Sequence, residues 1–110
     1  MTGEDASFFD ALAHGGDGGV LASAHADPAS FAALYRAWRA GDPAQALARW
    51  SGLVDLVRLF FAEPSPAAIK HWLWRQDLIA SPELRLPMTG VSPALAGRLD
   101  LMLAARPAAA

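Results

Sequence analysis

The stretch Gly15-Gly16-Asp17-Gly18-Gly19-Val20-Leu21-Ala22-Ser23 leads from a glycine-rich turn into a short, unbroken apolar run. A run of this length without polar alternation is typical of a strand covered on both faces, as in a parallel sheet. We therefore predict a β-strand over residues 19–23, the one plausible strand in the chain. A strand buried without neighbours leaves its edge N–H and C=O groups unpaired, at roughly 1–3 kcal/mol each, so it requires companion strands.

The segments around this run also favour part of a larger fold. Residues 1–3 are a candidate end of a preceding strand, because the interval from there to Gly19 holds one helix, as in a βαβ unit. Further helices are predicted to begin where an N-cap oxygen precedes proline. The three pairs are Asp27-Pro28, Asp42-Pro43 and Ser92-Pro93. A helix capped by Asp5 and one beginning at Ser65-Pro66 complete the set, and residues 77–90 are expected to form a packed coil.

The amino-acid composition excludes several classes of function. Apolar residues make up 54% of the 110 residues and charged residues 18%, against about 45–50% and 25% in ordinary domains. A formal charge of -2 lacks the basic excess that nucleic-acid binding needs, and the absence of cysteine excludes disulfides and Cys-based zinc sites. The acidic N-terminus is unlike a signal peptide, and the richest apolar stretch is about half the ~20 residues of a membrane span. We expect a cytoplasmic protein whose apolar surface is covered by protein, without nucleic-acid or membrane partners.

Two later sequence segments also carry information about the fold. They are Glu63-Pro64-Ser65-Pro66-Ala67-Ala68-Ile69-Lys70 and Leu84-Arg85-Leu86-Pro87-Met88-Thr89. Together with the run at residues 15–23, they resemble the C-terminal part of the dihydrodipicolinate synthase and N-acetylneuraminate lyase family. The resemblance covers roughly residues 2–103, with its elements in the family's order. The family often has Asn where Ser65 stands, and commonly has Gly at the position of Gln76 or Asp77.

The resemblance implies a mostly α-helical C-terminal fragment of a (β/α)8 TIM barrel. This fragment would comprise the end of strand 7, helix 7, strand 8 and helix 8, followed by a three-helix extension. Residues 1–41 would be the last part of the barrel, residues 42–106 the helical extension, and residues 107–110 a disordered tail. The catalytic half of the barrel is then expected to lie outside these 110 residues.

The resemblance further implies class I aldolase chemistry, in which a lysine on strand 6 forms a Schiff base with pyruvate or a related 2-oxo acid. A tyrosine from strand 5 would relay protons. Neither position lies in the matched region, so no residue here is expected to be catalytic and the chain alone is expected to be inactive. Gly3 and Val20 match substrate-binding positions beside the oxo acid. Ser23 and His25, after the predicted strand, are candidates for the pocket rim. No metal or cofactor is implied.

Other reactive side chains are given structural roles. Lys70 is the only lysine. It lies one turn into a predicted helix, without the dry pocket and proton relay that a Schiff-base lysine needs. We expect it to take part in packing or an ion pair. His14 and His71 show no metal-ligand spacing and are expected at a helix end or on the surface.

Two partner hypotheses and one competing function stay open at this point. The parent enzyme would bind pyruvate, and this chain would associate with a complementing N-terminal barrel chain or form a homo-oligomer. The competing interpretation is a non-enzymatic helical interaction or oligomerisation module. In that case the helices would pack by themselves and the short strand would become a loop.

Overall fold

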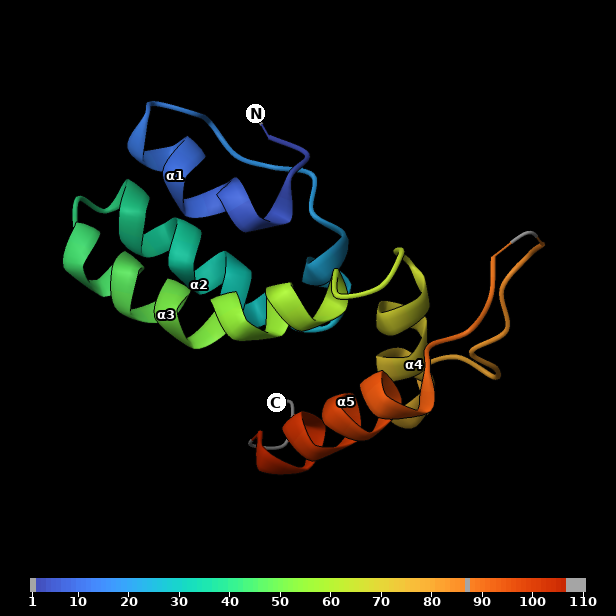
Figure 1. Cartoon of the computed structure of the whole chain (residues 1–110). Helices are drawn as coiled ribbons and strands as arrows, with labels where there is room; N and C mark the ends of the chain where they lie inside the picture. Colours follow the sequence, from blue (N-terminus) through green and yellow to red (C-terminus); the bar gives the residue numbers. More distant parts are fainter. Residues whose placement is uncertain (1, 87, 107–110) are drawn as a thin grey trace. The chain divides into compact units, whose positions relative to one another are not determined.

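The computed structural model describes residues 2–86 and 88–106 and is mostly helical, as predicted (Figure 1). The elements in chain order are η1 (Asp5–Ser7), α1 (Phe8–Ala13), η2 (Ala22–His25), α2 (Pro28–Arg39), α3 (Pro43–Phe60), α4 (Ala67–Arg75) and α5 (Pro93–Ala105). The chain divides into two compact units, unit 1 (Met1–Val57) and unit 2 (Arg58–Ala110). The predicted boundary between barrel and extension at residues 41 and 42 stays a prediction, and the predicted tail at 107–110 lies outside the described residues.

The predicted β-strand over residues 19–23 is wrong. Within residues 2–86 and 88–106 the only pairing of extended backbone is an isolated parallel bridge between Thr2 and Gly19. The Thr2 amide donates to the Gly18 carbonyl at 3.1 Å, and the Val20 amide donates to the Thr2 carbonyl at 2.9 Å. A strand propagates by pairing with neighbours, and here one edge has a single short partner. The backbone therefore turns back on itself as η2, where the Ala24 amide donates to the Leu21 carbonyl.

Unit 1 is built around an apolar cluster contributed by α1, α2 and α3. Its buried members are Phe8, Leu12, Phe31, Leu34, Leu53 and Val57. The Phe8 and Phe31 rings pack at a centroid distance of 6.0 Å. The predicted start of α2 is confirmed, because the Asp27 carboxylate accepts the Ser30 amide at 3.1 Å. Gly41, with a φ of 81°, lies in the left-handed region after α2, where glycine is favoured.

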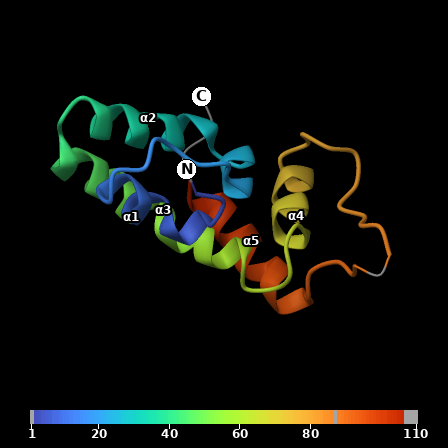
Figure 2. The same cartoon turned by 90° about the horizontal axis from the view of Figure 1, so that it is seen from above.

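Unit 2 contains the last residues of α3 together with α4 and α5, which lie side by side in both views and are joined by an irregular segment (Figures 1 and 2). Residues 77–86 and 88–90 contain no helix or strand, in agreement with the predicted coil, but most of them are exposed and none is buried, so the prediction that this coil is packed is wrong. Pro87, within that coil, lies outside the described residues. Trp72 of α4 is 1% exposed and meets the Phe60 ring edge-on, at a centroid distance of 5.4 Å. Ser92 caps α5 by accepting the Leu95 amide at 3.2 Å, as predicted.

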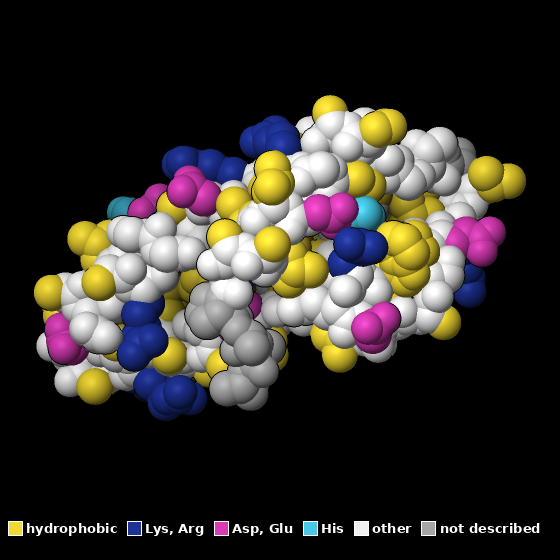
Figure 3. Space-filling model, turned by 90° about the horizontal axis from the view of Figure 1, so that it is seen from below, with side chains coloured by type: hydrophobic (Ala, Val, Ile, Leu, Met, Phe, Trp, Pro, Cys, Tyr) yellow, Lys and Arg dark blue, Asp and Glu magenta, His cyan; other side chains and the backbone are white. Residues whose placement is uncertain are grey.

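The surface carries charges of both signs and several large apolar side chains. On the face in Figure 3, the drawn acidic and basic side chains are interspersed, and hydrophobic side chains reach the surface between them. The most exposed large apolar residues are Leu86 at 92%, Leu101 at 74% and Val20 at 73%. None of the described helices combines the length and apolar character needed to cross a bilayer.

Candidate functional site

The structure brings together the two backbone segments that carry the predicted substrate-binding residues. Gly3 follows Thr2 directly, and Thr2 bridges to the segment that contains Val20. A Cβ atom added at Gly19 would lie 3.2 Å from Phe8 Cδ1 and 3.2 Å from the Thr2 carbonyl oxygen. Glycine at this position therefore permits the close approach of the two segments. The Val20 side chain points out of the unit 1 core and is 73% exposed.

Asp5 ties the same two segments together at a second point. The predicted role of Asp5 as a helix cap is wrong, because the 3-10 turn η1 precedes α1, whose N-cap is Ser7. The Asp5 side chain instead accepts the Ser23 amide at 2.7 Å. Asp5 is 2% exposed and Ser23 is fully buried, whereas His25 is exposed. No sequence signal indicated this bond, which joins residues 18 apart and becomes visible only in three dimensions.

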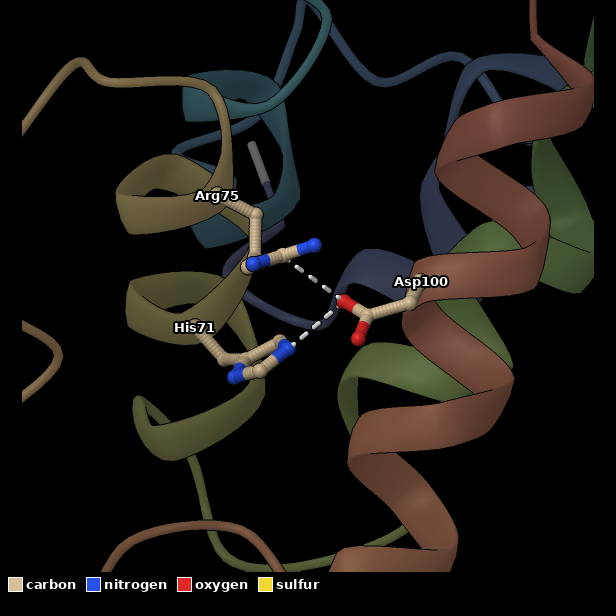
Figure 4. A network of polar contacts seen from close by, with 3 residues as sticks. All are labelled: His71, Arg75 and Asp100. Atoms are coloured by element: carbon tan, nitrogen blue, oxygen red, sulfur yellow. Dashed lines mark hydrogen bonds and ion pairs between the residues drawn. The ribbon is translucent and has the colours of Figure 1, made fainter.

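A second polar cluster lies in unit 2, where Asp100 of α5 faces His71 and Arg75 of α4 (Figure 4). His71 Nε2 lies 2.9 Å from Asp100 Oδ1, and Arg75 Nε lies 3.3 Å from the same oxygen. His71 is 8% exposed, so its predicted position at a helix end or on the surface is wrong. His14, at the C-terminal end of α1, agrees with the prediction. The His71–Asp100 pairing was missed because its members are 29 residues apart.

The sole lysine and the sole tyrosine of the chain are both held by backbone carbonyls. Lys70 Nζ donates to the Glu83 backbone carbonyl at 2.6 Å, a hydrogen bond that was not predicted from the sequence. The Tyr35 hydroxyl donates to the Asp17 carbonyl at 2.7 Å. Lys70 lies in unit 2 and Tyr35 in unit 1, each bonded within its own unit. Among the residues that the structure describes, no three His, Asp or Glu side chains are grouped as a metal site would require.

Glu63 links the segment before α4 to the start of α5. Its carboxylate accepts the Ser92 amide at 2.9 Å and also accepts the Ser92 hydroxyl. The same hydroxyl oxygen accepts the Leu95 amide, so Ser92 caps α5 while it binds Glu63. The hydrogen bonds from the Ser92 hydroxyl and amide lower the pKa of Glu63 below its ordinary value of 4.5.

We predict that Glu63→Gln weakens this link in a pH-dependent way. Because the pKa of Glu63 is lowered in the folded state, its carboxylate stabilises the fold above the unfolded-state pKa. That contribution is lost as the pH falls through the folded-state pKa. Thermal unfolding followed by circular dichroism should therefore show a Tm difference between wild type and variant at neutral pH that shrinks at acid pH. A Tm difference that is constant with pH would contradict the assignment.

Comparison with known proteins places the chain in one family. Residues 1–105 match the model of the dihydrodipicolinate synthetase family, and the chain belongs to that family. The family comprises lyases of the class I aldolase type with a TIM-barrel fold. Membership in this family does not favour the competing hypothesis of a non-enzymatic helical module.

Curated relatives and solved structures agree with this membership. 4-hydroxy-tetrahydrodipicolinate synthase 2 of Clostridium acetobutylicum is 39% identical over 103 residues, covering 94% of this chain and 36% of the relative. The corresponding synthase of Hyphomonas neptunium is 36% identical, covering 94% of this chain and 35% of the relative. Dihydrodipicolinate synthase from Aquifex aeolicus superposes with a TM-score of 0.89 at 28% identity, covering 94% of this chain and 35% of that one. The chain thus spans about a third of the length of these relatives.

A further solved structure includes a ligand. YagE of E. coli K12, from the dihydrodipicolinic acid synthase family, was solved in complex with pyruvate. It superposes with a TM-score of 0.80 at 26% identity, covering 93% of this chain and 35% of YagE.

Proposed function

We propose that the chain is the C-terminal part of a 4-hydroxy-tetrahydrodipicolinate synthase-type lyase that acts on pyruvate through a Schiff base. The family match over residues 1–105 carries this proposal. Curated relatives of that name and a relative solved with pyruvate support it. The cytoplasm is the proposed compartment, in keeping with a cysteine-free composition.

The proposal assigns no catalytic residue to these 110 residues. Lys70 is engaged by the Glu83 carbonyl, and Tyr35 by the Asp17 carbonyl, in separate units. A Schiff-base lysine needs a free amine in a pocket that lowers its pKa, with a proton relay beside it. The lysine and the tyrosine of the reaction would therefore come from a polypeptide that supplies the rest of the barrel. This chain alone would be inactive.

Within the assembled site, Gly3 and Val20 would border the bound oxo acid through their backbone. The bridge that joins Thr2 to Gly19 supports this role, because it sets their two segments side by side. His25, exposed at the end of η2, would lie toward the pocket rim, and Ser23 would support the rim from its buried position. These residues would shape a pocket without taking part in bond making.

Reductive trapping tests the proposal. Three samples are treated with radiolabelled pyruvate and borohydride. The first is this chain alone, the second is the N-terminal two-thirds of the Clostridium acetobutylicum relative alone, and the third is the two co-expressed. A Schiff base reduced by borohydride leaves a stable covalent label on lysine. We expect no label on this chain alone and stoichiometric label on the partner when the two are combined.

A partner whose lysines in the barrel are replaced by arginine serves as the matched control and should remain unlabelled. Stoichiometric labelling of Lys70 in the isolated chain would contradict its assigned inactivity. Failure of the combined chains to label, when they co-purify as a folded complex, would contradict the proposed contribution to a pyruvate site.

A further inference from the structure

Unit 2 contains a cavity of about 470 Å³ beside α4 and the irregular segment that leads to α5. This volume falls within the range of about 300–1,000 Å³ that is usual for small-molecule sites. The cavity is lined by Ala67, His71, Ser81, Pro82, Glu83, Leu84, Met88, Gly90, Val91 and Ala96. Ser81 and Glu83 are exposed and form the polar mouth, whereas His71 is the polar side chain that is buried.

The hydrogen bond from His71 to Asp100 determines which of its ring nitrogens can bind a ligand. An ionised carboxylate can only accept, so Nε2, at 2.9 Å from Asp100 Oδ1, carries the proton. In the neutral ring Nδ1 then carries a lone pair and acts as an acceptor. Figure 4 shows this second nitrogen directed away from Asp100. No hydrogen bond joins it to a described residue, and it is not one of the fully buried polar atoms, so it can be reached from outside although the residue is 8% exposed.

The contacts of Asp100 fix the orientation of the His71 ring. Arg75 binds the same Asp100 oxygen at 3.3 Å, so Asp100 is itself oriented. A carboxylate that binds one imidazole nitrogen fixes the orientation of the ring. At the outer side, Lys70 donates to the Glu83 carbonyl and secures the segment that forms the mouth. The cavity thus combines one fixed acceptor with walls held in place.

We propose that this cavity binds a small, uncharged molecule with an apolar body and one hydroxyl donor, of the phenol type. The apolar wall, which includes Leu84, Met88 and Val91, would cover the body of the ligand, and His71 Nδ1 would accept its hydroxyl proton in a hydrogen bond. A carboxylate ligand would instead place its lone pairs against that of Nδ1. The proposal is independent of the pyruvate chemistry, because every lining residue belongs to unit 2.

A pair of probes, one with and one without a hydroxyl donor, tests this site on the full 110-residue chain. 2-Naphthol has the hydroxyl, and 2-methoxynaphthalene has the same rings without it. Long-range 1H–15N NMR at a pH where His71 is neutral should show a saturable shift of its Nδ1 resonance with 2-naphthol. Loss of one hydrogen bond should make 2-methoxynaphthalene bind roughly five- to tenfold more weakly. Equal affinity for the two probes, or no saturable shift with 2-naphthol, would overturn the proposal.

Two variants separate the cavity from nonspecific binding. His71→Phe keeps an aromatic ring but removes the acceptor, and it should abolish the preference for 2-naphthol. Because that variant also removes one of the two partners of Asp100, Val91→Trp provides a second test by filling the cavity while leaving His71 in place. It should abolish the binding of both probes. His14→Phe, an exposed histidine in unit 1, is the matched control and should leave both affinities unchanged.

Discussion

Replacing Trp72 with alanine is expected to lower the free energy of unfolding of unit 2 by about 3–5 kcal/mol. Trp72 is 1% exposed, and its ring meets Phe60 edge-on at a centroid distance of 5.4 Å. Truncation removes the transfer free energy of the ring and leaves a cavity that the surrounding helices fill only in part. Because a domain is stable by only about 5–15 kcal/mol, the variant should unfold unit 2 at much lower denaturant concentration.

Trp74 on the same helix supplies the matched control. It is 36% exposed, so Trp74→Ala removes an equal number of atoms from a position that already faces solvent in part. Urea unfolding followed by far-UV circular dichroism should show a large fall in midpoint for Trp72→Ala and a small one for Trp74→Ala. Equal midpoints for the two variants would show that Trp72 is not the packing centre of unit 2.

A conservative replacement at the same site refines the test. The indole N–H of Trp72 is buried without a described partner, which is an unfavourable feature of the native structure. Trp72→Phe removes that N–H and keeps an aromatic ring against Phe60. It should therefore be much less destabilising than Trp72→Ala, and a midpoint equal to that of the alanine variant would contradict this account.

The helix starts could be predicted because their signals are local. Asp27, Asp42 and Ser92 each precede a proline, and each accepts the amide three residues later, at 3.1, 3.1 and 3.2 Å. Such a cap needs no information from elsewhere in the chain. The predicted strand, in contrast, could form only if other parts of the protein paired with it. The apolar run at residues 19–23 is strand-like in composition, but strand pairing depends on neighbours, and the described residues supply a single bridge.

The polar contacts that join α5 to earlier segments of unit 2 could not be predicted for a related reason. Glu63 binds Ser92, and His71 binds Asp100, across 29 residues in each case. Neither pair has a spacing that places its members on one helix face, so the sequence pattern carries no trace of the contact. The resemblance to the family indicated Gly3 and Val20 as substrate-binding positions. The hydrogen bond from the Ser23 amide to Asp5, which joins their two segments, became visible only in the structure.

Replacing Asp5 with alanine should release one of the bonds that join those segments. Asp5 is 2% exposed and accepts the amide of the fully buried Ser23 at 2.7 Å. Without the carboxylate the Ser23 amide is left buried and unpaired, at a cost of about 1–3 kcal/mol. The ends of the bridge between Thr2 and Gly19 then lose their second tether, so we expect unit 1 to lose stability and the bridge to open more often.

Hydrogen exchange locates that effect. The amides of Ser23 and Val20 should exchange faster in Asp5→Ala by roughly tenfold or more, since each 1.4 kcal/mol changes an opening equilibrium tenfold. Asp10→Ala, an exposed acid on α1, is the matched control and should leave both amides protected. Asp5→Asn retains an oxygen acceptor and should recover part of the protection. If Asp5→Ala leaves the exchange of Ser23 unchanged, this buried carboxylate does not hold the two segments of the candidate site together.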